Sequence, residues 1–469
     1  MPKKASPSLA VVVLAAGKGK RLKSRTPKVL HPVCGRPILW HVLRAAQQLK
    51  PKTIAVVVAD GSDVEEAVRS WGIEPAPVFV DQGTPLGTGH AALVAEDAVR
   101  RADEVVVLPG DEALVAGPML KAVLRRHRRR KAAATVQTTT IPDPRGFARI
   151  VKDDDRLIRL AEDASSDPEI ARIREVATCV YAFRRKELYA ALPILDTDNK
   201  QREYYLSDVP GILIDKGEVV AVEMADLGGA LGANSRGELA KATAVMRERI
   251  NEEHMATGVT LEDPQSAYID VDVRIGTDST IRPNTYLEGA SRIGKGAIIG
   301  PETRLVASSV GDGSEVQFSV VRGAKIGAGV EVGPYASVRP GTVLEDGSKA
   351  GTFVEIKASR VGKGSKVPHL SYVGDAKIGK GVNVGAATVT ANYDGYEKHE
   401  TMVDDDARIG SDTMLVAPVR VGKGAVTGAG SVITRDVPPG SLAVERSEQR
   451  NVEGYRKRKD RERRGRTKH

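Results

Sequence analysis

The sequence is poor in aromatic residues, in cysteine and in long apolar runs. Aromatic residues make up 4% of the 469 residues, and there are two cysteines, Cys34 and Cys179. Two cysteines do not provide a disulfide framework, so a reducing, cytoplasmic location is expected. No run of eighteen or more apolar residues occurs, so no membrane span is expected. Residues 1–8 also lack the apolar segment of a signal peptide.

Positive charge is concentrated at one end of the chain. The net charge is +9, and residues 455–469, with nine Lys or Arg against two acidic residues, account for +7 of it. The body of the chain is therefore close to neutral. A basic tail can contact nucleic acid, but a solvated, disordered end at 453–469 is the favoured interpretation, so nucleic acid is not expected as a partner. A second basic run, 125–131, is interpreted as an exposed helix end.

Between about residues 275 and 437 an aliphatic residue followed by glycine recurs at near-hexameric intervals, as at Ile275-Gly276, Ile293-Gly294, Ile299-Gly300 and Val310-Gly311. A hexapeptide period is typical of a parallel β-helix. Its aliphatic residues fill the core, its glycines take the corners, and each coil buries its apolar face only against its neighbours. Independent glycine-rich loops are the alternative, but about 160 residues in phase argue against them.

Apolar runs in the first half of the chain alternate with helical patterns. Leu9–Leu14 reads as a buried parallel strand, and further runs follow at 54–58, 78–80, 105–108 and 134–138. This alternation predicts an α/β sheet that binds its ligands beyond the carboxyl ends of its strands.

A helix is predicted between the two halves. Ser235, followed by Glu238, is a helix start, and the helical pattern runs to about Ala256. The sequence shows no tight partner for this helix, so we interpret it as a linker. The predicted organisation is a first domain at 1–235, a linker helix at 236–258, a β-helix at 259–452 and the tail at 453–469.

Three segments follow predicted strands in the first half. The glycine-rich turn 15–21 presents backbone N–H groups to phosphate, and Lys18, Arg21 and Lys28 add positive charge. The segment 82–90 offers the amide of Gln82 for a base edge and a second tight turn. Asp111 places a carboxylate at a strand end, where it either holds a hard cation or caps a helix.

These segments occur together in one known family. The motifs are L-A-A-G-x-G-x-R at 14–21, P-K-V-L at 27–30, L-G-T-G-H at 86–90, E-Y-Y-L at 203–206, P-H-L-S-Y-V-G-D-A at 368–376, N-Y-D-G at 392–395, G-S-D-T at 410–413 and V-A-P-V at 416–419. Through them the chain, from about Leu9 to Gly454, closely resembles the bacterial bifunctional N-acetylglucosamine-1-phosphate uridyltransferases and glucosamine-1-phosphate acetyltransferases. The resemblance implies a Rossmann-like nucleotidyltransferase domain followed by a left-handed β-helix.

Two reactions follow from this resemblance. The β-helix is expected to transfer acetyl from acetyl-CoA to the amine of glucosamine 1-phosphate. The α/β domain is expected to join the product to UTP with Mg²⁺, giving UDP-N-acetylglucosamine and pyrophosphate. The resemblance also implies a homotrimer, because the family's acetyl site lies where parallel β-helices meet.

Acetyl transfer needs an uncharged amine, and a neutral imidazole with a pKa near 6.5 is suited to remove its proton. A lone histidine is usually structural, but its motif identifies His369 as this base, with Glu355 as a group that orients it. The resemblance assigns the sugar phosphate to Arg339, Lys357, Tyr372 and Asn383. It assigns acetyl-CoA to Ala386, Asn392, Tyr393, Ser411, Ala429 and Arg446.

Uridyl transfer needs no protein nucleophile, so catalysis depends on positioning and on charge neutralisation. The resemblance assigns Mg²⁺ to Asp111 and Asn234 and a sugar contact to Glu162. It assigns the nucleotide to Leu14, Ala15, Ala16, Gly17, Lys28, Gln82, Gly87, Thr88 and Gly110.

The chain departs from the family pattern on the sugar side of the first domain. It reads Val176-Ala177-Thr178-Cys179 where the pattern has I/V-N-x-G, and Ala148 replaces a glycine. The proline that follows the G-D motif is missing at Glu112-Ala113. These changes predict altered sugar selectivity with an intact nucleotide site.

Two other functions remain open. A monofunctional sugar nucleotidyltransferase would use the β-helix only to build an oligomer, and would not need His369, Lys357 or Asn392. A non-catalytic scaffold would not need Gly17 or Asp111.

Overall fold

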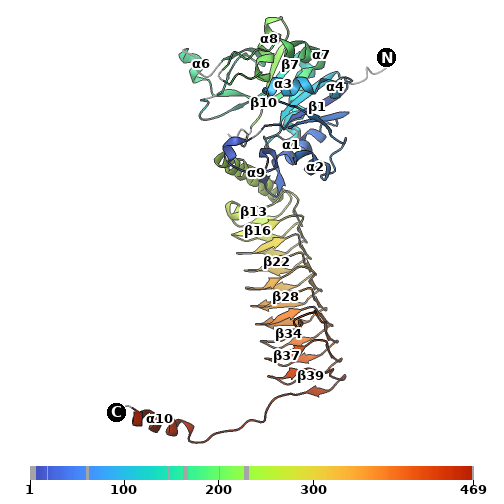
Figure 1. Cartoon of the computed structure of the whole chain (residues 1–469), viewed down its shortest axis with the longest axis vertical. Helices are drawn as coiled ribbons and strands as arrows, with labels where there is room; N and C mark the ends of the chain where they lie inside the picture. The colour runs from blue at the N-terminus through green and yellow to red at the C-terminus, as the bar shows by residue number, and fades with distance from the viewer. Residues whose placement is uncertain are drawn as a thin grey trace. The chain divides into compact units, whose positions relative to one another are not determined.

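The computed structural model describes residues 7–17, 19–59, 63–145, 147–161, 167–199, 201–226 and 232–466. The chain divides into two compact units (Figure 1). The first, here the α/β unit, comprises Met1–Glu253 with Ile269–Val271. The second, here the β-helix unit, comprises His254–Tyr268 with Asp272–His469. None of the helices among the described residues is long and apolar enough to cross a membrane.

The α/β unit contains a nine-stranded sheet of order β5-β4-β1-β6-β10-β7-β11-β9-β8. The five predicted strands are confirmed as β1 (Leu9–Leu14), β4 (Thr53–Val58), β5 (Val78–Asp81), β6 (Glu104–Pro109) and β7 (Ala134–Thr140). Strands β5, β4, β1 and β6 are mutually parallel, so their carboxyl ends meet at one edge. The sheet is completed by β8 (Arg149–Asp153), β9 (Arg156–Ala161), β10 (Glu175–Arg184) and β11 (Val220–Met224).

Both faces of this sheet are covered. Along β1, Ala10 and Val12 belong to one apolar cluster, whereas Val11 and Val13 belong to another, because successive side chains of a strand point to opposite faces. This two-sided burial explains why β1 is continuously apolar. The helices of the unit that precede its last one are α1 (Ile38–Gln47), α2 (Val64–Arg69), α3 (Thr88–Val94), α4 (Glu96–Val99), α5 (Gly117–Arg130), α6 (Pro168–Arg172), α7 (Arg185–Ala191) and α8 (Val209–Asp215).

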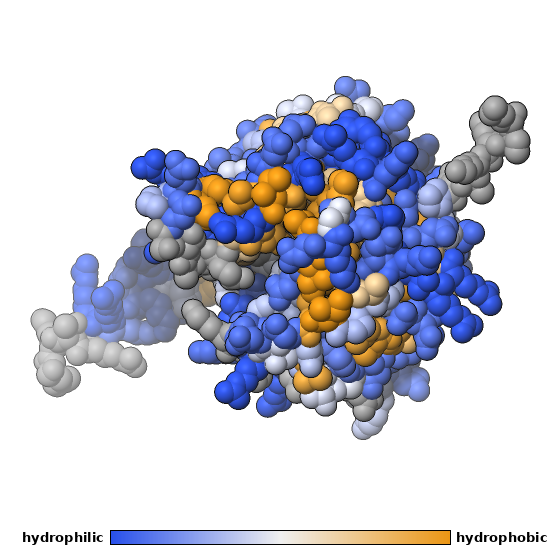
Figure 2. Space-filling model, turned by 90° about the horizontal axis from the view of Figure 1, so that it is seen from above, coloured by the Kyte–Doolittle hydropathy of each residue, from blue (hydrophilic) through white to orange (hydrophobic). Residues whose placement is uncertain are grey.

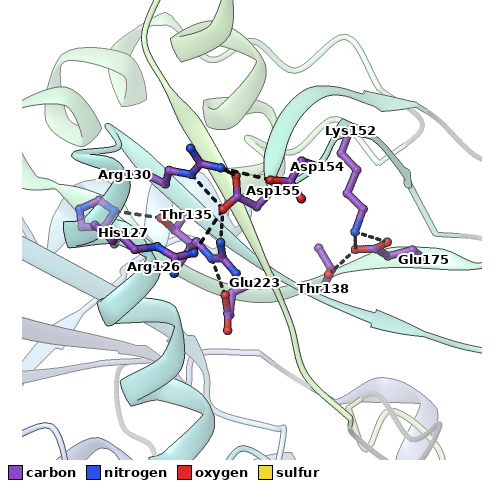
Figure 3. A network of polar contacts seen from close by, with 11 residues as sticks. Arg126, His127, Arg130, Thr135, Thr138, Lys152, Asp154, Asp155, Glu175 and Glu223 are labelled. Atoms are coloured by element: carbon purple, nitrogen blue, oxygen red, sulfur yellow. Dashed lines mark hydrogen bonds and ion pairs between the residues drawn. The ribbon is translucent and has the colours of Figure 1, made fainter.

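A buried polar network ties the C-terminal end of α5 to the far strands of the sheet (Figure 3). Asp155 accepts hydrogen bonds from Arg126 and Arg130, and the Nε of Arg126 donates to Glu223 at 2.7 Å. His127 lies 3.1 Å from Thr135 and is buried, and this burial lowers its pKa to about 4. The helix end predicted at 125–131 is present, but Arg126 is half-buried and His127 is buried rather than exposed to solvent.

The last helix of the α/β unit, α9 (Arg236–Ala256), begins with the predicted capping box. The Oγ of Ser235 accepts from the N–H of Glu238 at 3.2 Å, and the Glu238 carboxylate accepts from the N–H of Ser235 at 3.1 Å. Its residues up to 253 belong to the α/β unit, where Ala242 packs beside Leu114. This packing was not expected from the sequence, because α9 buries only a narrow strip, at Ala242, Ile250 and Asn251.

Hydrophobic side chains also reach the surface of the α/β unit. Figure 2 shows them gathered in a band on a face that is otherwise hydrophilic. The exposed large hydrophobic residues of this unit include Leu86, Phe147, Ile158 and Met224. Leu86 lies in the L-G-T-G-H segment, so part of the exposed apolar surface belongs to a predicted nucleotide-binding turn.

The β-helix unit confirms the left-handed β-helix predicted from the repeats. It is built of three parallel sheets with strands of two to four residues. One runs from β12 (Thr260–Leu261) to β41 (Leu442–Ala443), the second from β13 (Ala267–Ile269) to β40 (Val432–Ile433), and the third from β14 (Arg274–Ile275) to β38 (Val419–Val421). Aliphatic residues stack in columns inside, as do Ile293, Val310, Ile326, Leu344 and Val361.

The corners of the coils are closely packed. A Cβ at Gly311 would lie 2.5 Å from the backbone of Gly327 in the next coil, so only glycine fits there. The Oγ of Ser314, which is buried, donates to the carbonyl of Gly327 at 2.7 Å and accepts from the N–H of Val330 at 3.0 Å. Small hydroxyl side chains of this kind satisfy backbone groups where the chain turns.

One coil is longer than the others. Neighbouring coils are generally offset by 16 to 18 residues, as in the pairs Ile293–Val310 and Ile326–Leu344, but Asn383 pairs with Arg408, 25 residues later. The extra length forms a loop between β34 (Val389–Ala391) and β35 (Thr401–Val403). This loop interrupts the regular spacing of the coils.

The tail differs from its expected disorder. Tyr455–Arg466 forms helix α10, whose described side chains are exposed. Ion pairs at helical spacing join Arg456 to Asp460 at 3.4 Å and Lys459 to Glu462 at 2.9 Å. Such pairs stabilise a helix even where it packs against nothing. The expectation of disorder rested on the charged composition of the tail and did not consider the spacing of its charges.

Candidate functional site

The first candidate site lies at the carboxyl ends of β1 and β6. The N–H of Gly110 donates to the carbonyl of Leu14 at 2.8 Å, and a Cβ at Gly110 would lie 2.8 Å from that oxygen. A Cβ at Gly17 would meet nothing within 4 Å, so the backbone of the predicted phosphate turn is open. The structure thus brings Leu14, Ala15 and Gly110 together beside this turn, whereas Lys18 lies outside the described residues.

Lys28 links the two predicted metal ligands. Its Nζ is ion-paired with the carboxylate of Asp111 and donates to the Oδ1 of Asn234 at 2.6 Å. The side chains of Lys28 and Asp111 are 11% and 21% exposed, so the group is not sealed from solvent. Gly19 permits the close approach of Lys28, since a Cβ there would lie 2.6 Å from the Lys28 Cβ.

The oxygen donors of this group suit a small, hard cation. They are one carboxylate, Asp111, and one amide, Asn234, both directed at the same point. Among the described residues no cluster of three or more His, Cys, Asp or Glu forms a metal site. A cation held here would therefore take its remaining ligands from water or phosphate.

A second turn is held by the E-Y-Y-L segment. The N–H of Gly89 donates to the carbonyl of Tyr204 at 2.7 Å, and the Oγ1 of Thr88 accepts from the N–H of Leu206 at 3.0 Å. Gly87 has φ +110°, and a Cβ there would lie 2.5 Å from the Tyr204 carbonyl. The side-chain amide of Gln82, predicted for a base edge, donates to the carbonyl of Gly87 at 3.0 Å, so it braces this turn.

The sugar side contains the departures from the family pattern. Ala177 lies in β10, and the pairing of β10 with β7 shifts register between Ala177 and Tyr181. Within the shift, the Oγ1 of Thr178 donates to the carbonyl of Gln137 at 3.1 Å. Glu162, the predicted sugar contact, lies outside the described residues.

Glu112 was not predicted as a site residue; it was noted only because the proline that follows the G-D motif in the family pattern is missing at Glu112-Ala113. The side chain is 8% exposed, and burial, followed by the nearby charge of Asp111, raises its pKa to about 8. The available indication was an acidic residue directly after a strand-end aspartate and directly before the apolar run 113–115.

The second candidate site lies on successive coils of the β-helix. Arg339 follows β25 (Ser337–Val338), Lys357 ends β28 (Glu355–Lys357), and Tyr372 begins β31 (Tyr372–Gly374), and these strands are neighbours in one sheet. Three of the residues predicted to bind the sugar phosphate therefore lie in neighbouring coils of one sheet, and two of them are cationic.

His369 ends β30 (Lys366–His369) and is exposed, opposite Thr352 of the preceding coil. The Oγ of Ser371 donates to the His369 carbonyl at 2.7 Å, which fixes the backbone at this corner. Glu355, expected to orient His369, instead accepts from Arg339 at 2.7 Å. A hydrogen bond between Glu355 and His369 is not found among the described residues.

The loop after β34 folds toward Lys357 through Asp375. The carboxylate of Asp375 accepts from Lys357 at 3.3 Å and from the side-chain amide of Asn392. The pKa of Lys357 is raised, and the nearby carboxylate of Asp375 contributes to this because it favours the charged ammonium.

Four of the predicted acetyl-CoA residues lie at one corner of the β-helix, whereas Asn392 and Tyr393 lie in the loop after β34. Ala386, Ser411 and Ala429 lie in consecutive coils, connected by hydrogen bonds from the N–H of Asp412 to the Ala386 carbonyl at 2.7 Å and from the N–H of Gly430 to the Ser411 carbonyl at 2.9 Å. Arg446 donates to the Ala429 carbonyl at 2.9 Å. Asn383 lies on β33 (Asn383–Val384), just before this column.

Comparison with known proteins covers both units. Residues 11–205 match the family model described as "MobA-like NTP transferase domain". Three curated relatives bear the name "Bifunctional protein GlmU". That of Carboxydothermus hydrogenoformans is 45% identical over 447 residues, which is 95% of this chain and 99% of the relative. Those of Heliobacterium modesticaldum and Streptomyces avermitilis are 46% and 45% identical, over 96% of this chain and 98% and 94% of their own lengths.

Among solved structures, a Bacillus anthracis protein titled as a glucose-1-phosphate thymidylyltransferase superposes with a TM-score of 0.43. It is 20% identical over 51% of this chain and 95% of its own, a likeness too weak to add to the assignment.

Proposed function

The chain belongs to the bifunctional GlmU family, and from this premise we propose how its two units divide the family's work. The protein is a nucleotidyltransferase and an acyltransferase of UDP-N-acetylglucosamine synthesis, a pathway that supplies cell-wall precursors. It acetylates glucosamine 1-phosphate with acetyl-CoA and transfers uridylyl from UTP to the product. We assign acetyl transfer to the β-helix unit and uridyl transfer to the α/β unit.

In the β-helix unit, His369 is the proposed general base. The amine of glucosamine 1-phosphate attacks the thioester carbonyl of acetyl-CoA, His369 takes a proton from the amine, and the CoA thiolate leaves. Arg339 and Lys357 neutralise the sugar phosphate, and the raised pKa of Lys357 keeps it cationic. Acetyl-CoA lies along the corner column at Ala386, Ser411 and Ala429. The alignment of these groups on successive coils carries this assignment.

In the α/β unit, the phosphate of N-acetylglucosamine 1-phosphate attacks the α-phosphorus of UTP, and pyrophosphate leaves. The backbone of the turn at Gly17 receives phosphate oxygens, and Lys28 adds positive charge where negative charge develops. Asp111 and Asn234 are the proposed Mg²⁺ ligands, and the ion would neutralise phosphate charge. Asp111 and Asn234, which contact Lys28 in this structure, would hold the ion beside that positive charge.

We also propose a cytoplasmic homotrimer. Both cysteines are free, in keeping with a reducing compartment. An exposed apolar ridge follows one corner of the β-helix, with Tyr335 56%, Phe353 57% and Leu370 61% exposed, and Leu370 is next to the exposed His369. Neighbouring copies that cover this ridge would also enclose the acetyl site. Light scattering at micromolar concentration tests this, and a monomer active in acetyl transfer would refute it.

The two-reaction assignment is tested by product analysis. The protein is mixed with glucosamine 1-phosphate, acetyl-CoA, UTP and Mg²⁺, and the products are identified by mass spectrometry. N-acetylglucosamine 1-phosphate, UDP-N-acetylglucosamine and pyrophosphate are expected. A protein that makes the nucleotide sugar only from pre-acetylated substrate would instead be monofunctional, with a structural β-helix.

A further inference from the structure

One acidic side chain of the β-helix unit lies at a corner that the preceding coils fill with small residues. Asp375 directly follows β31, and the backbone at this corner has a positive φ, between +45° and +80°, in successive coils. The residues at the corner are Gly289, Ala307, Gly323, Gly341, Ala358 and Asp375. Side chains other than glycine are disfavoured in this left-handed region. Since alanine or glycine serves in the other coils, the fold does not need a carboxylate here.

Asp375 joins Lys357 to both ends of the long loop. Its Oδ2 accepts from the Nζ of Lys357 at 3.3 Å and also from the side-chain amide of Asn392, the first residue after β34. Its carbonyl accepts from the N–H of Thr401, the first residue of β35, at 3.2 Å. Its own N–H donates to the Lys357 carbonyl at 3.1 Å. The position of the loop is thereby linked to that of a cation assigned to the sugar phosphate.

Between its two ends the loop is a short hairpin. The N–H of His399 donates to the Asn392 carbonyl at 2.8 Å, and Tyr393 pairs with Lys398 in an antiparallel bridge. Asn392 is 8% exposed, so its side-chain amide has little access to water that could replace the bond to Asp375. The hairpin begins with two residues assigned to acetyl-CoA, Asn392 and Tyr393, and its orientation depends on Asp375.

We propose that Asp375 is a positioning residue for acetyl transfer, which sets Lys357 and Asn392 relative to each other through one carboxylate oxygen. This rests on the proposed assignment of acetyl transfer to the β-helix unit. An ammonium group has three N–H donors, so Lys357 can bind the sugar phosphate while it remains bonded to Asp375. One side chain that touches neither substrate therefore holds a residue assigned to each of them.

The test compares Asp375→Ala and Asp375→Asn in the full-length protein. Alanine is the residue that Ala307 and Ala358 place at the same corner, so the coil should fold, but both side-chain bonds are removed. Losing such a bond predicts that the KM values for glucosamine 1-phosphate and for acetyl-CoA each rise about two- to tenfold. Asparagine keeps a carbonyl oxygen in place of Oδ2, so its KM for acetyl-CoA should stay within about twofold of the parent.

A double-mutant cycle separates positioning from a general loss of structure. In a protein that already carries Lys357→Ala, Asp375→Ala should raise the KM for glucosamine 1-phosphate by less than about twofold, because the residue through which it acts is gone. In an Asn392→Ala background the same change should raise the KM for acetyl-CoA by less than about twofold. A structural defect would give the same factor in every background.

Glu331 provides a matched control. It is paired with Lys349 at 2.6 Å across neighbouring coils, and these two residues are 18 positions apart, as are Lys357 and Asp375. Glu331→Ala removes a lysine–carboxylate pair of the same spacing, and Glu331 is not among the residues assigned to the acetyl site. Both KM values should therefore match the parent. Uridyl transfer in the same samples reports whether the α/β unit is intact.

The inference is overturned if Asp375→Ala leaves either KM value unchanged, or if its effects are as large in the Lys357→Ala and Asn392→Ala backgrounds as in the parent. It is also overturned if Asp375→Asn is as impaired toward acetyl-CoA as Asp375→Ala. If the alanine variant does not fold, Asp375→Gly, which matches Gly323 and Gly341, replaces it with the same expected results. A parent protein that does not acetylate glucosamine 1-phosphate would instead refute the proposed function.

Discussion

The two units bury different kinds of polar side chain. Among the described residues, the buried polar side chains of the β-helix unit are Ser and Thr, with Asn392. Those of the α/β unit include ionisable groups, among them Glu112, His127 and Asp155. A hydroxyl can satisfy a neighbouring backbone group with one short bond, but a buried charge needs partners that are arranged around it.

The two sites also differ in how far apart in the sequence their residues lie. The bond between Lys28 and Asn234 joins residues 206 positions apart, whereas that between Lys357 and Asp375 joins residues 18 positions apart. The site of the α/β unit therefore forms only when distant segments meet. The site of the β-helix unit is assembled from adjacent coils. The two should accordingly respond independently to mutation and to pH.

The largest effect should come from His369→Ala. Removing a general base typically costs about 10²- to 10⁴-fold in rate, so acetyl transfer should fall by that factor. Uridyl transfer, measured in the same preparation from N-acetylglucosamine 1-phosphate and UTP, should be unchanged. Loss of both activities in a folded protein would show that the two sites are not separate.

Asp111→Ala should give the reverse pattern. The change removes one of two oxygen donors beside Lys28, and losing such charge stabilisation costs about 10²- to 10³-fold. Uridyl transfer should fall accordingly and its Mg²⁺ requirement should rise, whereas acetyl transfer is the internal control. A variant with normal uridyl transfer would exclude Asp111 as a metal ligand.

Acid should destabilise the α/β unit through His127. The pKa of His127 is lowered from 6.5 to about 4 in the folded protein, so the unfolded chain binds this proton first as pH falls. Protonation of His127 in the unfolded chain leaves the free energy of unfolding unchanged above pH 6.5. Near pH 4 it lowers that free energy by about 3 kcal/mol. Denaturant titrations at several pH values should show a smaller loss in His127→Gln than in the parent. Equal losses would mean that His127 does not stay neutral when folded.

The smallest effect is expected at Ala177. An asparagine there would add about one neutral hydrogen bond to the acetamido group, so Ala177→Asn should lower the KM for N-acetylglucosamine 1-phosphate roughly two- to tenfold. The KM for UTP should not change. Steady-state kinetics decides this, and an unchanged KM for the sugar phosphate would remove Ala177 from the pocket.

The β-helix was predictable because its pattern is local. From Ile293 to Val361 each coil meets the next one 16 to 18 residues later, so this aliphatic column is visible as a period in the sequence. Strand β1 was predictable for a related reason, since burial on both faces makes it continuously apolar. The capping box of α9 lies within four residues and was equally readable.

Contacts that depend on tertiary structure were not predictable. The packing of Ala242 on Leu114 joins distant segments, and the sequence around α9 does not indicate it. Arg126 belongs to a basic run that looks like a solvated helix end, yet it bonds to Glu223, 97 residues away. Glu355 was expected to orient His369, but its carboxylate accepts a hydrogen bond from Arg339 in the neighbouring coil. Composition and spacing do not decide between such competing partners.

The long coil at 383–408 has a practical consequence. The extra residues leave and rejoin the stack without disturbing the pairing of the flanking strands, since β33 still pairs with β36 and β34 with β37. Tyr396, at the outer part of the loop, is 93% exposed. A solenoid of this kind accepts added chain at a corner, because only the coils carry its stability. The loop around Tyr396 is therefore a site where a peptide tag or a small domain can be inserted while the β-helix remains folded.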